Sequence, residues 1–412
     1  MTADRNPGIV AGMAKDHDIQ PPPMSYGALF VRFLRFGFAA FGGPVAQIAM
    51  VRRELVERER WISGAGFNRL LAVMQALPGP EAHELCVHLG IRARGRLGGL
   101  LAGLGFMLPG FVLMLLCAWA YFRFDVSGGA AGAVLAGAQA AVVALIIRAT
   151  HRIGEHVLVD RWLWVIGAAA GAATLLAAPF WAVLPAAAAI YGLAHARRPR
   201  LAGLLLICGL AAVAAWALRG GASPQPLVPA TTAENAASWA LLFGSGLKAG
   251  LLTFGGAYTA IPFVRQDLVG GGRLGDGTFL DGVALANVLP APLIIFATFA
   301  GYAVGGLPGA LAMTAGVFLP AFAFSMIFYD GLEAVVANPV LRVALDGVAA
   351  AVVGIIAATV VSLAVGLHEP ASPSVLPFVL VLISLAALYW LKGRFVPPLV
   401  LLAAGVAGWL AG

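Results

Sequence analysis

The sequence predicts an all-α polytopic membrane protein with about thirteen spanning segments arranged as two homologous halves. Three observations carry this prediction. The chain of 412 residues is 61% hydrophobic and 11% charged, with a mean hydropathy of +0.91, which does not describe soluble domains. Apolar windows of about 20 residues, the length that crosses a hydrocarbon core of roughly 30 Å, recur along almost the whole chain. An internal repeat relates residues 25–196 to residues 238–412.

The apolar windows follow a polar N-terminal stretch. Residues 1–24 contain Pro21-Pro22-Pro23 and lack the basic-then-apolar layout of a cleaved signal peptide, so we expect a disordered tail. The windows begin near Ala28, Phe67, Leu97, Gly128, Trp162, Phe180, Leu201, Ser238, Leu280, Gly305, Val340, Ser374 and Phe395. The window at Leu201 lies in a connector, residues 197–237, between the two copies of the repeat.

Charge and cysteine content exclude several classes of protein. The net charge of +7 sits in short loops between apolar windows, which indicates membrane topology and no nucleic-acid partner. The three cysteines lack CxxC spacing, so neither a disulfide framework nor a zinc site is expected. His83 and His88 are five positions apart, whereas a zinc-binding HExxH motif needs four. With no P-loop and no nucleophile constellation either, we expect no metal, no cofactor and no enzyme activity.

The internal repeat aligns unusual residues in one order. The run RFGFAAFGGPVA from Arg35 returns as KAGLLTFGGAYT from Lys248, so a basic residue stands six positions before FGG in both copies. The motif LPGP of the first copy returns as LPAP in the second. Further pairs are Arg52 with Arg265, Glu54 with Asp267, Gln75 with Asn287, Pro78 with Pro290 and Pro80 with Pro292.

The repeated motifs predict helices that are broken within the membrane. Glycine lets the backbone leave helical geometry, and proline removes a backbone donor. Freed backbone is tolerated at membrane depth only where protein or a water-filled cavity receives it, and helix N-termini and basic residues favour an anion there. The expected substrate-binding residues are Arg35, Gly42, Gly43, Pro44, Gln75, Pro78, Gly79, Pro80, Lys248, Gly255, Gly256, Asn287, Pro290 and Pro292.

A second set of residues is a candidate for coupling or gating. Arg52 with Glu54, and Arg265 with Asp267, would be gating ion pairs or ordinary loop charges. Glu81 and His83, together with Glu84 and His88, form a titratable cluster that the second copy lacks. These residues would relay protons, or would line a cavity rim without coupling.

Topology follows from counting windows. Six spans per copy and one connecting span make the copies enter the membrane from opposite sides, as an inverted repeat. A cytoplasmic N-terminus then places the basic stretches 92–96, 148–161, 197–200 and 392–394 inside, but leaves the loop 52–60 outside. If residues 67–89 instead formed a re-entrant hairpin at Pro78, the N-terminus would be outside and the copies parallel.

With these residues in view, the chain resembles the long-chain chromate ion transporter family. The resemblance rests on FGGPVAQIAMVRRELVERERWIS, QALPGPEA and FMLPG in the first half, and on LKAGLLTFGGAYTAIPFV in the second. It implies a multi-pass protein of the bacterial inner (plasma) membrane that exports chromate, with sulfate as competitor or exchange partner, and that confers chromate resistance. A permease for another inorganic or small organic anion, or an anion channel, is the alternative. Membrane lipid is the expected surrounding, and a homodimer is left open.

Overall fold

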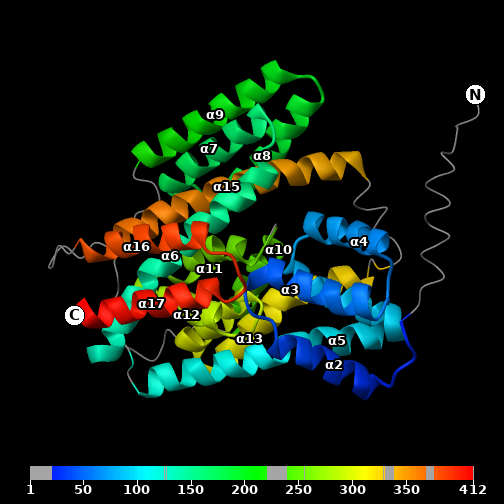
Figure 1. Ribbon diagram of the computed structural model, residues 1–412. Coiled ribbons are helices and arrows are strands. Elements are labelled where there is room, and N and C mark those ends of the chain that lie inside the picture. Colours follow the sequence, from blue (N-terminus) through cyan, green and yellow to red (C-terminus); the bar gives the residue numbers. More distant parts are fainter. Residues whose placement is uncertain are drawn as a thin grey trace, which may run out of the picture.

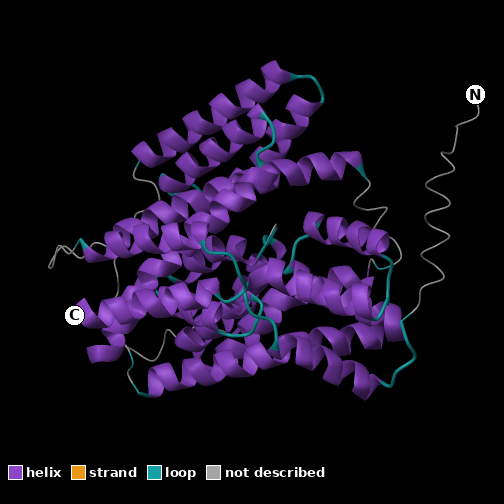
Figure 2. Ribbon diagram, viewed as in Figure 1, coloured by secondary structure: helices purple, strands orange, loops and turns teal. Residues whose placement is uncertain are grey.

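The computed structural model describes residues 21–124, 126, 128–219, 239–254, 256–327, 329, 338–367 and 375–411. These residues form fifteen α-helices and no strand, which confirms the all-α prediction (Figures 1 and 2). Five helices are long and apolar enough to cross a membrane, and the total of thirteen spans stays a prediction. Most of the expected N-terminal tail, residues 1–20, lies outside the described residues.

The same order of helices occurs twice along the chain. The helices of the first half are α2 (Tyr26–Phe38), α3 (Gly43–Arg52), α4 (Gly64–Ala76), α5 (Glu81–Arg123), α6 (Gly129–Val157), α7 (Arg161–Leu175) and α8 (Phe180–His195). The connector contains α9 (Pro199–Leu218). The helices of the second half are α10 (Trp239–Leu251), α11 (Ile261–Leu268), α12 (Asp276–Val288), α13 (Phe296–Ile327), α15 (Pro339–Gly366), α16 (Leu376–Trp390) and α17 (Val396–Ala411). Short turns of π- or 3-10-helix accompany them: η1 (Arg53–Arg58), η2 (Ala257–Ala260) and η3 (Leu293–Ile295).

Helices α5 and α13 are each a fold-back of two helical arms. The backbone reverses at Gly95, with φ 65°, and at Gly306, with φ 60°, a conformation that glycine adopts without a Cβ clash. A Cβ added to Gly90 would lie 2.6 Å from the carbonyl oxygen of Gly98, so the two arms of α5 touch through their backbones. The equivalent contact in α13 is 2.5 Å.

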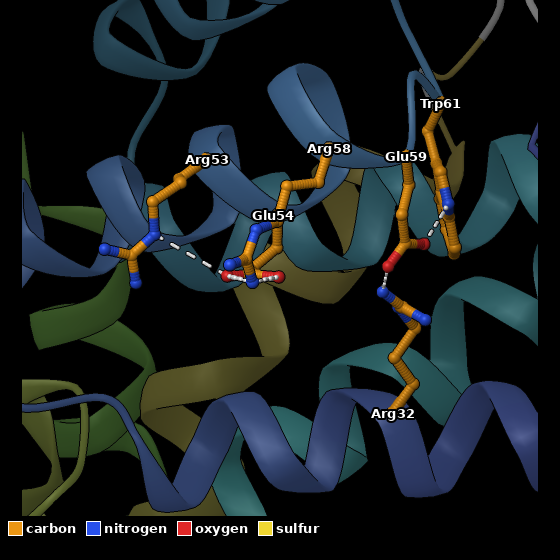
Figure 3. A network of polar contacts seen from close by, with 6 residues as sticks. All are labelled: Arg32, Arg53, Glu54, Arg58, Glu59 and Trp61. Atoms are coloured by element: carbon orange, nitrogen blue, oxygen red, sulfur yellow. Dashed lines mark hydrogen bonds and ion pairs between the residues drawn. The ribbon is translucent and has the colours of Figure 1, made fainter.

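The first apolar window also reverses direction instead of running straight through. Arg32 of α2 forms an ion pair with Glu59, which follows α3 and η1 (Figure 3). The ring centroids of Phe33 and Trp61 are 6.2 Å apart. The chain therefore turns back at the FGG motif. The loop 52–60 consequently lies beside α2, contrary to the expectation that a whole span separates them.

The two halves are interlocked through their C-terminal helices. Helix α6 packs against α16 and α17, and α15 packs against α7 and α8 (Figure 1). Glycine allows these crossings to be close. A Cβ on Gly137 of α6 would lie 2.1 Å from the carbonyl oxygen of Ala404, and one on Gly354 of α15 would lie 1.9 Å from that of Gly167.

The second arm of α5, residues 96–123, and the second arm of α13, residues 307–327, run antiparallel to each other at the centre of the molecule. A Cβ on Gly103 would lie 2.4 Å from the ring of Phe322, whereas Phe122, further along α5, stacks on Tyr302 at 5.9 Å. Tyr302 precedes the fold-back of α13. The fold-backs of α5 and α13 therefore lie at opposite ends of the molecule.

Candidate functional site

The repeated motifs coincide with helix ends, as the sequence predicts. FGG separates α2 from α3 and α10 from η2, and LPxP separates α4 from α5 and α12 from η3. Gly42 adopts a left-handed conformation, φ 89° and ψ 16°, and Pro44 follows in the first turn of α3. Gly79 has φ 147° and Gly256 has φ 125°. Gly255 lies outside the described residues.

Each break of one half is hydrogen-bonded to the other kind of break in the other half. The backbone N–H of Gly79, in LPGP, donates to the carbonyl oxygen of Thr253, next to the second FGG, at 2.8 Å. In the reciprocal place, the side-chain amide of Gln47 donates to the carbonyl oxygens of Ala40 and Ala291, both at 2.9 Å. Gln47 is 1% exposed. These bonds satisfy carbonyl groups that the helix breaks leave without an intrahelical partner.

The two predicted amides lie beside these breaks, where each has a local partner. Asn287 accepts a hydrogen bond from the hydroxyl of Tyr258 at 2.9 Å and donates to the carbonyl oxygen of Val283 at 2.9 Å. The amide of Gln75 hydrogen-bonds the side chain of Glu81. In both halves, therefore, the amide is positioned just ahead of the LPxP break.

The two predicted cations differ in their surroundings despite the repeat. Arg35 is exposed on α2, and no ion pair joins it to a carboxylate among the described residues. Lys248 forms an ion pair with Asp267, which also accepts a 2.7 Å hydrogen bond from Ser245, and its ammonium lies 4.5 Å from the ring centroid of Phe180. The charge of Lys248 is balanced within the protein, and its role in holding an anion stays a prediction.

Of the two alternatives for Arg265, an ion pair with Asp267 is contradicted by the structure. Arg265 instead binds Asp276 of α12 through two hydrogen bonds of 2.7 and 2.9 Å. Residues two positions apart on a helix point to different faces, which disfavours a contact between positions 265 and 267.

For Arg52, an ion pair with Glu54 is likewise contradicted by the structure. Arg52 donates to Asn68 of α4 at 3.2 Å and lies 3.7 Å from Glu57. Glu54 accepts two hydrogen bonds from Arg58, at 3.0 and 3.1 Å, as Figure 3 shows. In both halves, therefore, the arginine of the helix that follows FGG forms a side-chain hydrogen bond to the next α-helix, α4 or α12.

The titratable cluster of the first half is buried against LPGP. Glu81 is 7% exposed and His83 and Glu84 are fully buried. The ring of His83 packs on Phe318 and Phe322 of α13, with centroids 5.0 and 4.7 Å apart. Neither carboxylate oxygen of Glu84 has a hydrogen-bond partner among the described residues.

Glu84 also touches the break itself. A Cβ on Gly79 would lie 2.2 Å from Oε1 of Glu84, and the φ of 147° at this residue favours glycine. The repeat places Phe296, fully buried, where the first half has Glu84. The acid is therefore confined to one half.

Sequence reasoning missed several residues of this region. Gln47 and Thr253 belong to the quoted motifs, and a glutamine within an apolar helix was the available signal for Gln47. Arg148 of α6 opens the basic stretch 148–161 of the topology prediction, and its guanidinium lies 6.0 Å from the ring centroid of Tyr389 and interacts electrostatically with Tyr258.

Broken helices that meet around buried polar groups define a multi-pass helical membrane protein of the transporter class. Sequence comparison narrows this class: the chromate transporter family profile matches residues 27–193 and 240–409. The chain belongs to the chromate transporter family.

Three relatives cover most of the chain. A chromate transport protein of Pseudomonas aeruginosa is 59% identical over 95% of this chain and 93% of its own length. A chromate transport protein of Cupriavidus metallidurans is 33% identical over 83% of this chain and 84% of its own. A probable chromate transport protein of Synechococcus elongatus is 30% identical over 94% of this chain and 96% of its own. The comparison with solved structures finds no match.

Proposed function

We propose that this protein exports chromate from the bacterial cytoplasm across the inner membrane, with sulfate as competitor or exchange partner, and thereby confers chromate resistance. The observation that carries the proposal is the crossed pair of breaks, in which Gly79 binds Thr253 and Gln47 binds Ala291, in a chain of the chromate transporter family. Backbone N–H groups at such breaks suit a small tetrahedral anion. The name of the 59% identical relative supports chromate as the first choice.

We further propose that the halves form an inverted repeat. The opposite directions of α5 and α13 support this arrangement. In the first half the chain turns back at FGG, and the contact of Arg52 with Asn68 puts the start of α4 at the end of α3. A second reversal at LPGP would return the chain to the same side. Each reversal removes one crossing of the membrane, so two reversals leave the side on which the following helix begins unchanged. The proposal therefore combines a hairpin at Pro78 with halves of opposite orientation.

The N-terminus is proposed to be cytoplasmic. Arg94, at the fold-back of α5, lies 4.2 Å over the ring of Tyr26 at the start of α2, and Glu59 contacts Arg32 of the same helix. The basic loop 52–60 and the basic stretch 92–96 would thus share one side of the membrane, as the positive-inside tendency asks.

Export is the favourable direction for a dianion. A negative interior favours exit by about 2.3 kcal/mol per charge per 100 mV, so roughly 4.6 kcal/mol for chromate. Import would need coupling to protons or sodium. Glu81 and His83 of the buried cluster are the proposed coupling residues, because buried titratable groups inside membrane proteins are costly and mark proton relays in pumps and transporters.

The test is chromate uptake into everted membrane vesicles that contain the protein. The expected result is saturable uptake that excess sulfate blocks and an imposed membrane potential changes. Uptake that never saturates and shows no exchange would indicate an anion channel. An absence of uptake by well-inserted protein, with uptake of another anion, would replace chromate by that anion.

A further inference from the structure

We infer that Arg148 of α6 holds the transported oxyanion, together with Asn287 of the second half, whose amide Tyr258 positions by a hydrogen bond. This inference rests on the proposed function and deepens it, because it assigns the charged ligand of the anion to a residue outside the repeated motifs. Of the repeated cations, Arg35 is exposed on α2 and Lys248 is ion-paired with Asp267, so neither is a buried cation without a carboxylate partner.

The first support is position. Helix α6 crosses from its own half to the second half and packs against η2, the turn that follows the second FGG. Arg148 lies within electrostatic range of Tyr258 in that turn, and the Tyr258 hydroxyl is hydrogen-bonded to Asn287 at 2.9 Å. Asn287 stands three residues before the LPAP break. Helix α6 packs against both η2, which carries Tyr258, and α12, which carries Asn287, so Arg148 stands on the helix that borders both breaks of the second half.

The second support is charge balance. Lys248 is paired with Asp267, Arg265 with Asp276 and Arg32 with Glu59. Arg148 is also partly buried, but no ion pair joins it to a carboxylate in the described part of the chain. Its described neighbour is the face of Tyr389, which stabilises a cation without neutralising it. A cation left uncompensated within a spanning helix is suited to an anionic ligand.

The groups around Arg148 favour a dianion. His151, one turn further on α6, is hydrogen-bonded to the Tyr389 hydroxyl at 2.8 Å. Arg152 follows on the same helix, and its positive charge interacts electrostatically with Glu81, which directly follows the LPGP break. The turn between α16 and α17 brings Arg394 against the first FGG, since a Cβ on Gly42 would lie 2.7 Å from its carbonyl oxygen. The arginines named here, Arg148, Arg152 and Arg394, outnumber the carboxylates named with them, Glu81 and Glu155, and Glu155 lies 3.7 Å from Nε2 of His151.

The site is single although the fold is repeated. The repeat aligns Arg148 with Ala358 of α15, and Arg152 with Ser362, so α15 carries no equivalent charge. One oxyanion would bind off the pseudo-symmetry axis, on the α6 side. Arginine suits this role because its planar guanidinium binds two oxygens of a tetrahedral oxyanion at once. Asn287 retains one N–H after its bond to Val283 and can donate it to a third oxygen.

The test is chromate binding to the full chain in lipid nanodiscs, measured by titration calorimetry and repeated with sulfate. Arg148→Gln removes the charge and should raise the Kd for both anions about tenfold or more. Arg148→Lys should raise it about threefold, because lysine keeps the charge but cannot bind two oxygens at once as the planar guanidinium does. Arg123→Gln removes an exposed arginine at the far end of α5 and serves as the matched control. Its Kd should equal that of the wild type.

The outcomes separate this inference from the proposed function. If wild-type protein binds chromate or sulfate and Arg148→Gln binds equally well, the inference is overturned while the proposed function stands. If wild-type protein binds neither anion, the proposed function itself falls. Should Arg148→Gln fail to fold, Arg148→Lys decides, since an unchanged Kd in that folded variant overturns the bidentate role.

Discussion

Gly79 and Thr253 are joined by a backbone hydrogen bond of 2.8 Å, although they lie in different halves of the chain. The bond links the LPGP break of the first half to the FGG break of the second. A motion that separates the halves must therefore break this bond and rearrange both breaks together. The site and the interface between the halves are one structure.

Replacing Gln47 should disturb both breaks at once. Gln47→Leu leaves the carbonyl oxygens of Ala40 and Ala291 without their donor, at a cost of about 1–3 kcal/mol for each buried group left unpaired. We expect a lower midpoint of thermal unfolding in detergent and little chromate uptake. Gln47→Glu keeps the shape and removes the donor, so it should behave similarly. A variant with wild-type stability and transport would contradict the role assigned to this amide.

The pair of Lys248 and Asp267 predicts rescue by a second substitution. Lys248→Met should abolish uptake, because it leaves a partly buried carboxylate without its partner. The double variant Lys248→Met/Asp267→Asn removes both charges, and we expect it to recover most of the uptake in everted vesicles. Continued loss of transport in a well-folded double variant would show instead that the ammonium contacts the anion.

Close helix crossings predict that one glycine of α15 tolerates no side chain while another does. Gly354→Ala forces a Cβ to within 1.9 Å of the Gly167 carbonyl oxygen and should destabilise the protein by about 1–3 kcal/mol. Gly366→Ala, on the same helix, meets nothing within 4 Å and should be neutral or slightly stabilising. Thermal unfolding in detergent checks both. Equal midpoints would mean that the α7–α15 crossing is looser than described.

The buried acid of the first half predicts a change in coupling. Glu84 has no partner for its oxygens in the described residues, and an unpaired buried carboxylate is accommodated best with a proton bound. Glu84→Gln mimics the protonated acid and should fold normally. If Glu84 carries a coupling proton, an imposed pH gradient should stimulate chromate uptake by the wild type but not by the variant. Equal stimulation of both would remove Glu84 from the coupling mechanism.

Opposed halves predict opposite labelling of equivalent loops. The test uses a variant without the three native cysteines. In it, Arg58→Cys lies at the end of η1, after α3, and Arg273→Cys lies after α11, the helix of the second half that follows FGG. A membrane-impermeant maleimide should label Arg58→Cys in everted vesicles and Arg273→Cys in spheroplasts. Arg96→Cys, near the fold-back of α5, should follow Arg58→Cys. Labelling of positions 58 and 273 from the same side would exclude the inverted repeat.

Local chemistry explains which parts of the fold the sequence predicts. The breaks at Gly42 and Pro78 are foreseeable because glycine and proline act on their own stretch of backbone. Window counting predicts that helices exist, but it misses reversals such as the one at Gly95, since hydropathy does not report direction. The reversal becomes visible only through contacts such as that of Gly90 with Gly98.

Side-chain partners are harder to predict than helix ends. Sequence spacing suggests Asp267 as the partner of Arg265, but the partner is Asp276, because the choice depends on how α11 and α12 meet. Arg148 looks like an interfacial charge when α6 is considered alone. Its surroundings become polar only because the second half brings Tyr258 and Tyr389 to it.

The packing of α6 against α17 also determines the order in which the protein can assemble during synthesis. Gly137 of α6 receives its neighbour Ala404 only after most of the chain has been translated. At about 5–20 residues per second, α6 waits roughly a quarter of a minute to a minute for α17. Until then the surface of α6 at Gly137 faces lipid or the insertion machinery. Nascent chains that stall within the second half should therefore be substrates for membrane quality control, even though every segment of their first half has been inserted.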